Sequence, residues 1–247
     1  MRRDYTEVFL DPAVVDRYEH LVYAPDSYAS AVNQRQRRYL RQLVRRAFPV
    51  RRPVQHDFAC GTGRAIRLLH GLVRAAHGYD TSPMMLAKAA EVGTLATLHQ
   101  VEATGPVPDP VPAPGPAIVT IFRTLLNADE STRDRAIGFA AKILPRWESG
   151  LLVVENHGNR SSLRHLRQRR HAGEPWFGEL SHQEVAELLA RHGFTVVERR
   201  GFAMLTRGWY GIRGLRLLAR GLDELAGRIR WLHKWSVNVL YVARRTT

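Results

Sequence analysis

Two glycines and two carboxylates in this chain have the spacing expected of a site for a nucleoside. Gly61 and Gly63 form a turn between a strand-like run and a helix-like one, which brings backbone N–H groups close to a ligand. Asp80 ends the next strand-like run, 19 residues after Gly61, where a carboxylate can accept both hydroxyls of a ribose. Glu102 follows the third such run, where it can accept a hydrogen bond from an adenine amino group.

The glycine turn alone fits two kinds of nucleotide ligand. A dinucleotide site requires a small last residue in Gly-x-Gly-x-x-Gly/Ala, because the helix packs closely on the strand there. Ile66 occupies that position, and no second strand–helix pair is shaped for a nicotinamide half. The turn therefore favours an adenosyl ligand without phosphates. Cys60 has no evident activating base and is interpreted as a small residue in a tight turn.

Four segments match, in order, the motifs of the class I S-adenosylmethionine-dependent methyltransferases, which the chain resembles over roughly residues 50 to 200. They are residues 57–63 (DFACGTG), 78–86 (GYDTSPMML), 102–103 (EA) and 122–127 (FRTLLN). The resemblance implies S-adenosyl-L-methionine as cofactor, S-adenosyl-L-homocysteine as product and no metal. It also implies that Gly61 and Gly63 pack against the methionine part. The cofactor-binding residues predicted in this way are Asp57, Ala59, Gly61, Gly63, Asp80, Thr81, Met85, Glu102, Ala103, Phe122 and Tyr18.

Three polar residues follow the fourth and fifth predicted strands and could serve methyl transfer. A hydroxyl acceptor needs a general base, commonly His, whereas an amine needs only deprotonation and orientation. His157 is the candidate base, with a structural hydrogen-bonding role as the alternative. Arg123 could hold an anionic substrate or the cofactor carboxylate, and Asn127 lies next to the expected methyl position. The residues predicted to contact the acceptor are Tyr28, Asn156, Asn159, Trp209 and Tyr210.

Alternating strand-like and helix-like segments must position these residues. Strands are predicted at 54–59, 75–80, 95–101, 116–122, 151–157, 194–202 and 236–243, and helices at 62–74, 83–91, 130–144 and 181–192. This β-α repeat predicts an α/β fold, a Rossmann-like seven-stranded and mostly parallel sheet with helices on both faces. Ligands in such sheets bind at the carboxyl ends of the strands. Six prolines within residues 105–116 predict an extended loop rather than a helix before the fourth strand.

Two helical regions lie outside this repeat. Residues 1–49 are predicted to form an N-terminal helical cap on a core of residues 50–247, and one of its helices is expected to start at residues 26–28. Residues 206–235 interrupt the last two strands as a basic amphipathic helix, broken near Gly221 or Gly227. This insertion is interpreted as a substrate lid, a dimer helix or a segment that docks on an anionic membrane.

The charge of the chain is strongly positive. It carries 37 Lys and Arg against 23 Asp and Glu, a net charge of +14, and 34 of the basic residues are Arg because Lys occurs only three times. Such a charge is expected from a GC-rich genome or from an anionic partner: a phosphorylated substrate, an acidic lipid surface or nucleic acid. No signal peptide or membrane-spanning run is visible, and the single cysteine excludes an intramolecular disulfide and a Cys-based zinc site. We therefore expect a cytoplasmic protein, either a monomer or a homodimer.

Nucleic acid is disfavoured as the acceptor. Enzymes that methylate the exocyclic amines of bases carry an Asn/Asp-Pro-Pro-aromatic tetrad after the fourth strand, and residues 122–125 are not that tetrad. The sequence instead predicts methyl transfer to an oxygen or nitrogen of a small polar or sugar-containing metabolite, in specialised (natural product) metabolism. A lipid-linked acceptor at a membrane surface and nucleic acid are the alternatives.

Overall fold

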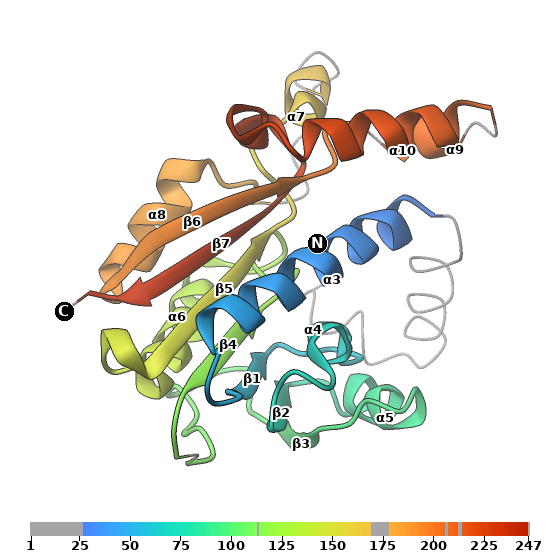
Figure 1. The fold of residues 1–247 in the computed structure, drawn as a ribbon. Coiled ribbons are helices and arrows are strands. Elements are labelled where there is room, and N and C mark those ends of the chain that lie inside the picture. Colours follow the sequence, from blue (N-terminus) through green and yellow to red (C-terminus); the bar gives the residue numbers. More distant parts are fainter. Residues whose placement is uncertain (1–26, 113, 169–177, 206, 212–213, 247) are drawn as a thin grey trace, which may run out of the picture.

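The computed structural model describes residues 27–112, 114–168, 178–205, 207–211 and 214–246. Its centre is a seven-stranded sheet of order β3-β2-β1-β4-β5-β7-β6 (Figure 1). All strands run in one direction except β7, which is antiparallel to both β5 and β6. The strands are β1 (Val54–Phe58), β2 (Ala75–Asp80), β3 (Thr97–Gln100), β4 (Ala117–Ile121), β5 (Gly150–Asn156), β6 (Phe194–Phe202) and β7 (Asn238–Arg245). The predicted fold class is confirmed.

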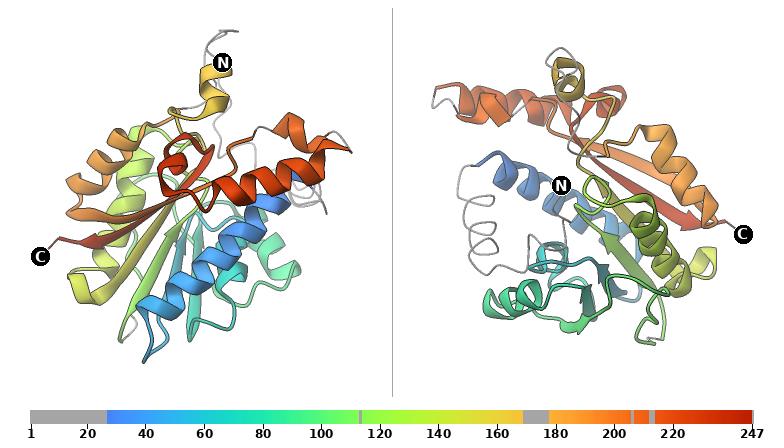
Figure 2. Two further views of the ribbon diagram at one scale, coloured as in Figure 1. Left: turned by 45° about the horizontal axis from the view of Figure 1, so that its top comes forward. Right: turned by 180° about the vertical axis from the view of Figure 1, so that it is seen from behind.

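Helices cover both faces of the sheet. Those of the described residues are α3 (Tyr28–Ala47), α4 (Arg64–Leu69), α5 (Pro83–Glu91), α6 (Glu130–Ile143), α7 (Leu163–Gln168), α8 (His182–Arg191), α9 (Arg207–Gly211) and α10 (Leu215–Ala226), with 3-10 helices η2 (Trp147–Ser149) and η4 (Arg230–Trp235). Helices α3 and α4 lie on one face, and α6 and α8 lie on the other (Figure 2). Each of these helices buries the side that packs on the strand residues beneath it.

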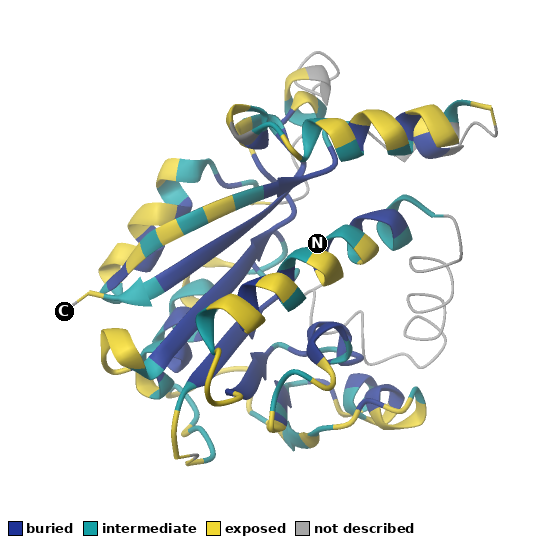
Figure 3. Cartoon of the chain, in the orientation of Figure 1, coloured by how far each residue is buried: buried dark blue, intermediate teal, exposed yellow. Residues whose placement is uncertain are grey.

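Alternation along the central strands divides the core into two layers. Val119 and Ile121 of β4 face α6 and α8, whereas Ile118, which precedes Val119, faces α3 and α4. In β5, Leu152 and Val154 alternate with their neighbours in the same way. Successive strand residues point to opposite faces, so an unbroken apolar run is buried on both sides. The result is a sheet whose middle strands are buried and whose covering helices are exposed only on their outer sides (Figure 3).

The predicted helix starts are confirmed where a side chain caps the helix. Ser27, Ser82 and Ser181 each accept a hydrogen bond from a backbone N–H of the first turn. Glu184 completes the capping box at the start of α8 by accepting from the Ser181 N–H. These contacts are local in sequence, which is why the residue types alone indicate them.

Some predicted elements have other limits in the structure. The helix after the glycine turn spans Arg64–Leu69 instead of residues 62–74, because Gly63 and Gly71 at its two ends both have left-handed backbones, with φ of 79°. Strand β3 is two residues shorter at its start. Helix α10 continues through Gly221 and ends at Ala226, so of the two predicted break points it is Gly227 that follows the end of the helix. The short helix α7 was not predicted.

Helix α3, the described part of the predicted N-terminal cap, packs directly on the sheet. Its Leu40, Leu43 and Val44 are buried in the same layer as β4 and β5. The division into a cap of residues 1–49 and a core stays a prediction, since residues 1–26 lie outside the described residues. Within the described residues, no helix has both the length and the apolar character needed to cross a bilayer.

Candidate functional site

The glycine turn leaves β1 at its carboxyl end and holds three residues in the left-handed region. Ala59, Gly61 and Gly63 have φ of 55°, 53° and 79°. A Cβ at Gly63 would lie 2.4 Å from Cγ2 of Thr94, so the turn is too crowded there for any side chain. Ala59 keeps the left-handed backbone although it carries a Cβ, which costs about 1–2 kcal/mol. The first left-handed position of the turn is therefore an alanine.

Asp80 fastens this turn to the end of β2. Its Oδ2 accepts from the Gly61 N–H at 2.7 Å, and its Oδ1 accepts from the Ser82 N–H at 2.9 Å. Burial raises the pKa of Asp80, and the backbone N–H donors oppose that shift. The Thr81 N–H is a third donor to this carboxylate, which has about four acceptor directions in all, so a direction remains for a ribose hydroxyl. Thr81, next to it, is half-buried.

Asp57 lies within β1 at the end of a buried chain of hydrogen bonds. Gln55 Nε2 donates to Oγ1 of Thr120 at 3.1 Å, and that hydroxyl donates to Asp57 Oδ1 at 2.5 Å. Burial raises the pKa of Asp57 to about 7, while the Thr120 hydrogen bond and the Arg64 charge act in the opposite direction. The carboxyl therefore sits beneath the turn and titrates near neutral pH.

The residues predicted to surround an adenine lie beyond β2 and β3. Glu102 and Ala103 are exposed, and the Val101 N–H donates to the Asp80 carbonyl at 2.9 Å. This backbone contact places the predicted adenine segment beside the predicted ribose carboxylate. Met85 is buried at the start of α5, and its Sδ lies 3.9 Å from the position of a Cβ on Gly61. Three strand ends thus bring these residues to one edge of the sheet.

The segment after β4 is bent by a second left-handed residue. Arg123 has φ of 60°, and Asn127 Nδ2 donates to its carbonyl at 3.3 Å. This contact joins the two ends of the turn, and the catalytic function of Asn127 stays a prediction. Phe122 is buried, and the Arg64 guanidinium lies 5.2 Å from the centre of its ring.

A buried polar network, not predicted from the sequence, joins α3, α4 and β5. Arg64 donates to Glu155 Oε2 at 2.5 Å and to Gln36 Oε1 at 2.8 Å, and Gln36 Nε2 donates to Glu155 Oε1 at 2.6 Å. All three side chains are buried. The signal in the sequence was an acidic residue that follows the apolar run of β5, near the end of the strand, together with an arginine straight after the glycines. The network anchors the first turn of α4 to two elements distant in sequence.

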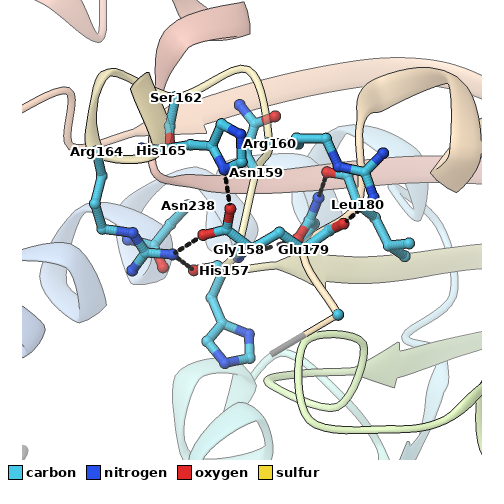
Figure 4. Close-up of polar contacts among 12 residues, drawn as sticks. His157, Gly158, Asn159, Arg160, Ser162, Arg164, His165, Glu179, Leu180 and Asn238 are labelled. Atoms are coloured by element: carbon cyan, nitrogen blue, oxygen red, sulfur yellow. Dashed lines mark hydrogen bonds and ion pairs between the residues drawn. The ribbon is translucent and has the colours of Figure 1, made fainter. Parts of the chain in front are cut away.

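His157 follows β5 and is 7% exposed. Its ring points away from the contacts that Arg164 and His165 make with Glu179 (Figure 4). The Nδ1 atom is buried and has no hydrogen-bond partner among the described residues. Burial, and then the charges of Arg123, Arg164 and Arg64, hold the pKa of His157 well below its usual range. The imidazole is therefore neutral at pH 7 and keeps a lone pair or an N–H for a ligand.

Asn156 and Asn159, predicted to orient an acceptor, are fully buried and tie the loop after β5 instead. Asn156 donates to the Leu180 carbonyl at 2.9 Å and accepts from the Gly158 N–H at 3.0 Å. Asn159 Nδ2 donates to the carbonyls of Lys234 and Ser236, both at 2.8 Å. Because backbone groups already engage both amides, these contacts support a structural function for them.

The predicted aromatic contacts belong to the junction of α3 with the insertion. The rings of Tyr28 and Tyr210 meet edge to face at 5.2 Å, and Tyr210 donates to Asp223 Oδ2 at 2.5 Å. Asn238 Nδ2 donates to the Tyr28 hydroxyl at 3.0 Å. Burial raises the pKa of Tyr210 to about 12. Trp209 is 37% exposed, and Tyr18 lies outside the described residues.

The described residues contain no group of three or more His, Cys, Asp or Glu placed to hold a metal ion. The groups at the carboxyl edge are instead hydrogen-bond acceptors, one neutral imidazole and a cradle without side chains. Such a set suits an organic ligand with hydroxyl and amino groups.

Comparisons with known proteins agree on the architecture. No family model and no curated protein matches the sequence. Among solved structures, magnesium protoporphyrin IX methyltransferase from Synechocystis with bound SAH has a TM-score of 0.61 at 14% identity, with 98% of each chain covered. An S-adenosylmethionine-dependent methyltransferase from Clostridium acetobutylicum has 0.58 at 12% identity, covering 95% of this chain and 98% of the other. The [4+2]-cyclase SpnF has 0.54 at 18% identity, covering 90% and 83%.

Proposed function

We propose that this chain, which has the class I S-adenosylmethionine-dependent methyltransferase fold, binds S-adenosylmethionine and transfers its methyl group to a small acceptor. The observation that carries the proposal is the convergence of the glycine turn, Asp80 and Glu102 at adjacent strand ends. The [4+2]-cyclase among the similar structures makes clear that the fold alone does not dictate the reaction. The argument for methyl transfer must therefore come from the residues of the site.

The cradle fits the cofactor part by part. Gly61 leaves space at the turn for the methionine part, since a Cβ there would meet only Met85 Sδ, at 3.9 Å, whereas Thr94 already occupies the space beside Gly63. Asp80 has an acceptor direction left for a ribose hydroxyl, and the exposed Glu102 follows the neighbouring strand, where it could accept from an adenine amino group. Met85 and Phe122 add apolar surface at the same edge.

When bound, S-adenosylmethionine supplies a methyl group on a positively charged sulfur that a nucleophile can displace in line. The chain has to orient the acceptor, exclude water and remove one proton. His157 suits the last task because it is neutral at pH 7. Its low pKa makes it a weak base, but an oxygen or nitrogen that is bonding to methyl becomes strongly acidic, so a weak base suffices.

The acceptor proposed is a small polar or sugar-containing metabolite, methylated on oxygen or nitrogen. The support is the position of a neutral imidazole after β5 and of Arg123 after β4, two adjacent strands of the sheet. Arg123 would attract an anionic group on the acceptor. The lid interpretation of residues 206–235 is consistent with the contacts of Tyr28 and Tyr210 near this edge.

Calorimetric binding of S-adenosylhomocysteine tests the cofactor assignment. Glu102→Ala should weaken binding about ten- to hundred-fold, since it removes one hydrogen bond to a charged group from an exposed position. Asp109→Ala, in the proline-rich loop with a 93% exposed side chain, is the matched control and should bind as the wild type does. A wild-type protein that binds neither S-adenosylmethionine nor S-adenosylhomocysteine would refute the proposal.

A further inference from the structure

Helix α10 presents a row of exposed leucines. Leu217, Leu218, Leu222 and Leu225 are 75%, 54%, 45% and 56% exposed. The spacing of 218, 222 and 225 places them on one side of the helix. Single exposed leucines are ordinary, but four on a twelve-residue helix form a continuous apolar strip. The strip requires an explanation that the core of the protein does not supply.

The opposite side of α10 is fixed to the rest of the molecule. Ala219 is fully buried and Asp223 is 2% exposed. Asp223 Oδ1 accepts from the N–H groups of Met204 and Leu205 at 2.8 and 3.1 Å. From α3, Arg35 donates to the Arg220 carbonyl at 3.0 Å. These contacts fix the rotation of α10 about its axis, so its leucines face away from the rest of the molecule.

Positive charge flanks the leucines. Residues 206–235 contain seven Lys and Arg and only two Asp and Glu. Both acids lie within ion-pair distance of arginines of α3: Asp223 of Arg35, and Glu224 of Arg35 and Arg38. A groove of about 510 Å³ between α3 and α10 is lined by the arginines at 35, 38, 220 and 228, with Glu224 the acidic residue of its lining. Among the described residues, Arg228 after α10 and Lys234 in η4 are the exposed cations of the insertion, and they lie at the end of the leucine strip.

Tryptophans continue the surface beyond α10. Trp231 is 64% exposed and meets Trp235 edge to face at 5.4 Å. The Lys234 ammonium lies 4.4 Å from the centre of the Trp235 ring. Tryptophan rings with nearby cations are typical of the headgroup region of a bilayer, where one end of the ring is apolar and the other is wet.

We propose that α10 and η4 dock in the plane of an anionic lipid bilayer. The leucine strip and Trp231 enter the boundary between headgroups and acyl chains, and the exposed Arg228 and Lys234 meet lipid phosphates. In Figure 1, α10 lies along one edge of the molecule, away from the sheet, so a flat surface can reach it. A protein partner would fit the leucines, but the excess of arginine specifically favours a polyanionic surface. This docking is independent of the methyl acceptor.

Vesicle co-sedimentation tests the surface. The wild-type protein should bind vesicles of phosphatidylcholine mixed with phosphatidylglycerol, bind pure phosphatidylcholine several-fold less, and dissociate as salt is raised. The double variant Leu218→Ser/Leu222→Ser should lose most binding. Its control is Leu95→Ser/Val197→Ser, which replaces two equally exposed apolar residues elsewhere and should bind like the wild type.

The arginines need a test of their own. Arg228→Gln should weaken binding to the anionic vesicles and reduce its salt dependence, whereas Arg52→Gln, an exposed arginine far from α10 in sequence, should change neither. All variants should bind S-adenosylhomocysteine as the wild type does, which separates this inference from the cofactor assignment. Absent vesicle binding, equal loss in the control pair, or a dimer that the α10 leucine variant dissociates in light scattering would overturn the proposal.

Discussion

His157 is the side chain on which the chemistry of the proposed site depends. It is buried, its Nδ1 lacks a partner among the described residues, and neighbouring arginines keep it neutral. A histidine kept for structure would use both ring nitrogens within the fold. The unused nitrogen therefore favours contact with a ligand, although the residue was selected from the sequence only by its place after the fifth strand.

Replacing His157 with alanine should lower kcat about 10²–10⁴-fold if the ring removes the acceptor proton. The dissociation constant of S-adenosylhomocysteine should stay within two-fold of the wild-type value, about the scatter of calorimetry. Methyl transfer from a labelled cofactor, measured once an acceptor is found, gives the rate. His70→Ala, at an exposed histidine, is the control. Unchanged turnover in His157→Ala would remove the general-base assignment.

Asp57 should make the stability of the protein depend on pH in an unusual direction. Burial raises the pKa of its carboxyl in the folded chain to about 7 from the usual 3.8. The folded state therefore keeps a proton that the unfolded state loses, and stability falls as pH rises through this window. His56, with a pKa lowered to about 4 by burial and by His77 and His99, acts with the opposite sign.

Asp57→Asn isolates this effect, because both proteins keep the same histidines. Asparagine can still accept from Thr120, but it does not titrate. As pH rises from 5 to 8, the free energy of unfolding of the variant should therefore increase by about 3 kcal/mol relative to that of the wild type. Urea unfolding at the two pH values measures the difference. Parallel pH profiles of the two proteins would contradict a carboxyl that titrates near neutral pH.

At the scale of elements, α4 is flanked by two left-handed glycines with different surroundings. Gly63 and Gly71 share a φ of 79°, but a Cβ at Gly63 would collide with Thr94 whereas one at Gly71 would meet nothing within 4 Å. The same backbone is therefore crowded at one end of α4 and open at the other. Alanine substitutions at these two glycines therefore separate the free-energy cost of the left-handed backbone from the cost of the collision with Thr94.

The free energy of unfolding of Gly71→Ala should be about 1–2 kcal/mol lower than that of the wild type, because an alanine in the left-handed conformation costs that much. Gly63→Ala should lose more, because it adds the collision with Thr94, and it should weaken binding of S-adenosylhomocysteine where Gly71→Ala does not. Chemical unfolding and calorimetry provide the two measurements. Equal losses in both variants would mean that Thr94 moves aside and that the turn is less confined than its geometry indicates.

For the whole molecule, the insertion is attached to the body through a few buried groups around Asp223. This carboxylate accepts hydrogen bonds from the backbone just after β6 and from Tyr210, and it lies within ion-pair distance of Arg35 of α3. Glu224, its neighbour in sequence, has a 40% exposed side chain and pairs with the same helix at the surface. A buried ion pair that loses one partner is costly, whereas an exposed pair contributes little.

Asp223→Ala should therefore loosen the insertion while leaving the sheet intact. Hydrogen exchange should become faster in α9 and α10, with β4 and β5 as protected as in the wild type, because local opening needs less energy than global unfolding. Glu224→Ala should leave exchange in α10 nearly unchanged. Faster exchange throughout the chain would indicate instead that the insertion and the sheet unfold as one unit.

Much of this architecture follows from local sequence. Three of its features depend on residues within a few positions of one another. They are the hydrophobic runs that become strands, the capping serines at 82 and 181, and the proline-rich loop before Ala117. The glycine turn and Asp80 were found in the same way, since their spacing along two consecutive strands indicates their meeting. Periodicity and capping are short-range effects, which is why the sequence by itself determined the elements, the sheet class and the edge that carries the site.

Tertiary structure alone decided which polar groups are free for a ligand. Arg64 and Glu155 are 91 positions apart and Gln36 and Glu155 are 119 apart, so their network has no local signature. The amides of Asn156 and Asn159 look like ligand groups in the sequence, yet the loop after β5 and residues 234–236 engage them. Burial makes an unpaired polar group expensive, so distant segments satisfy one another wherever they meet. The groups left to contact a ligand or a surface, at His157, Glu102 and the outer face of α10, can therefore be identified only when these tertiary contacts are known.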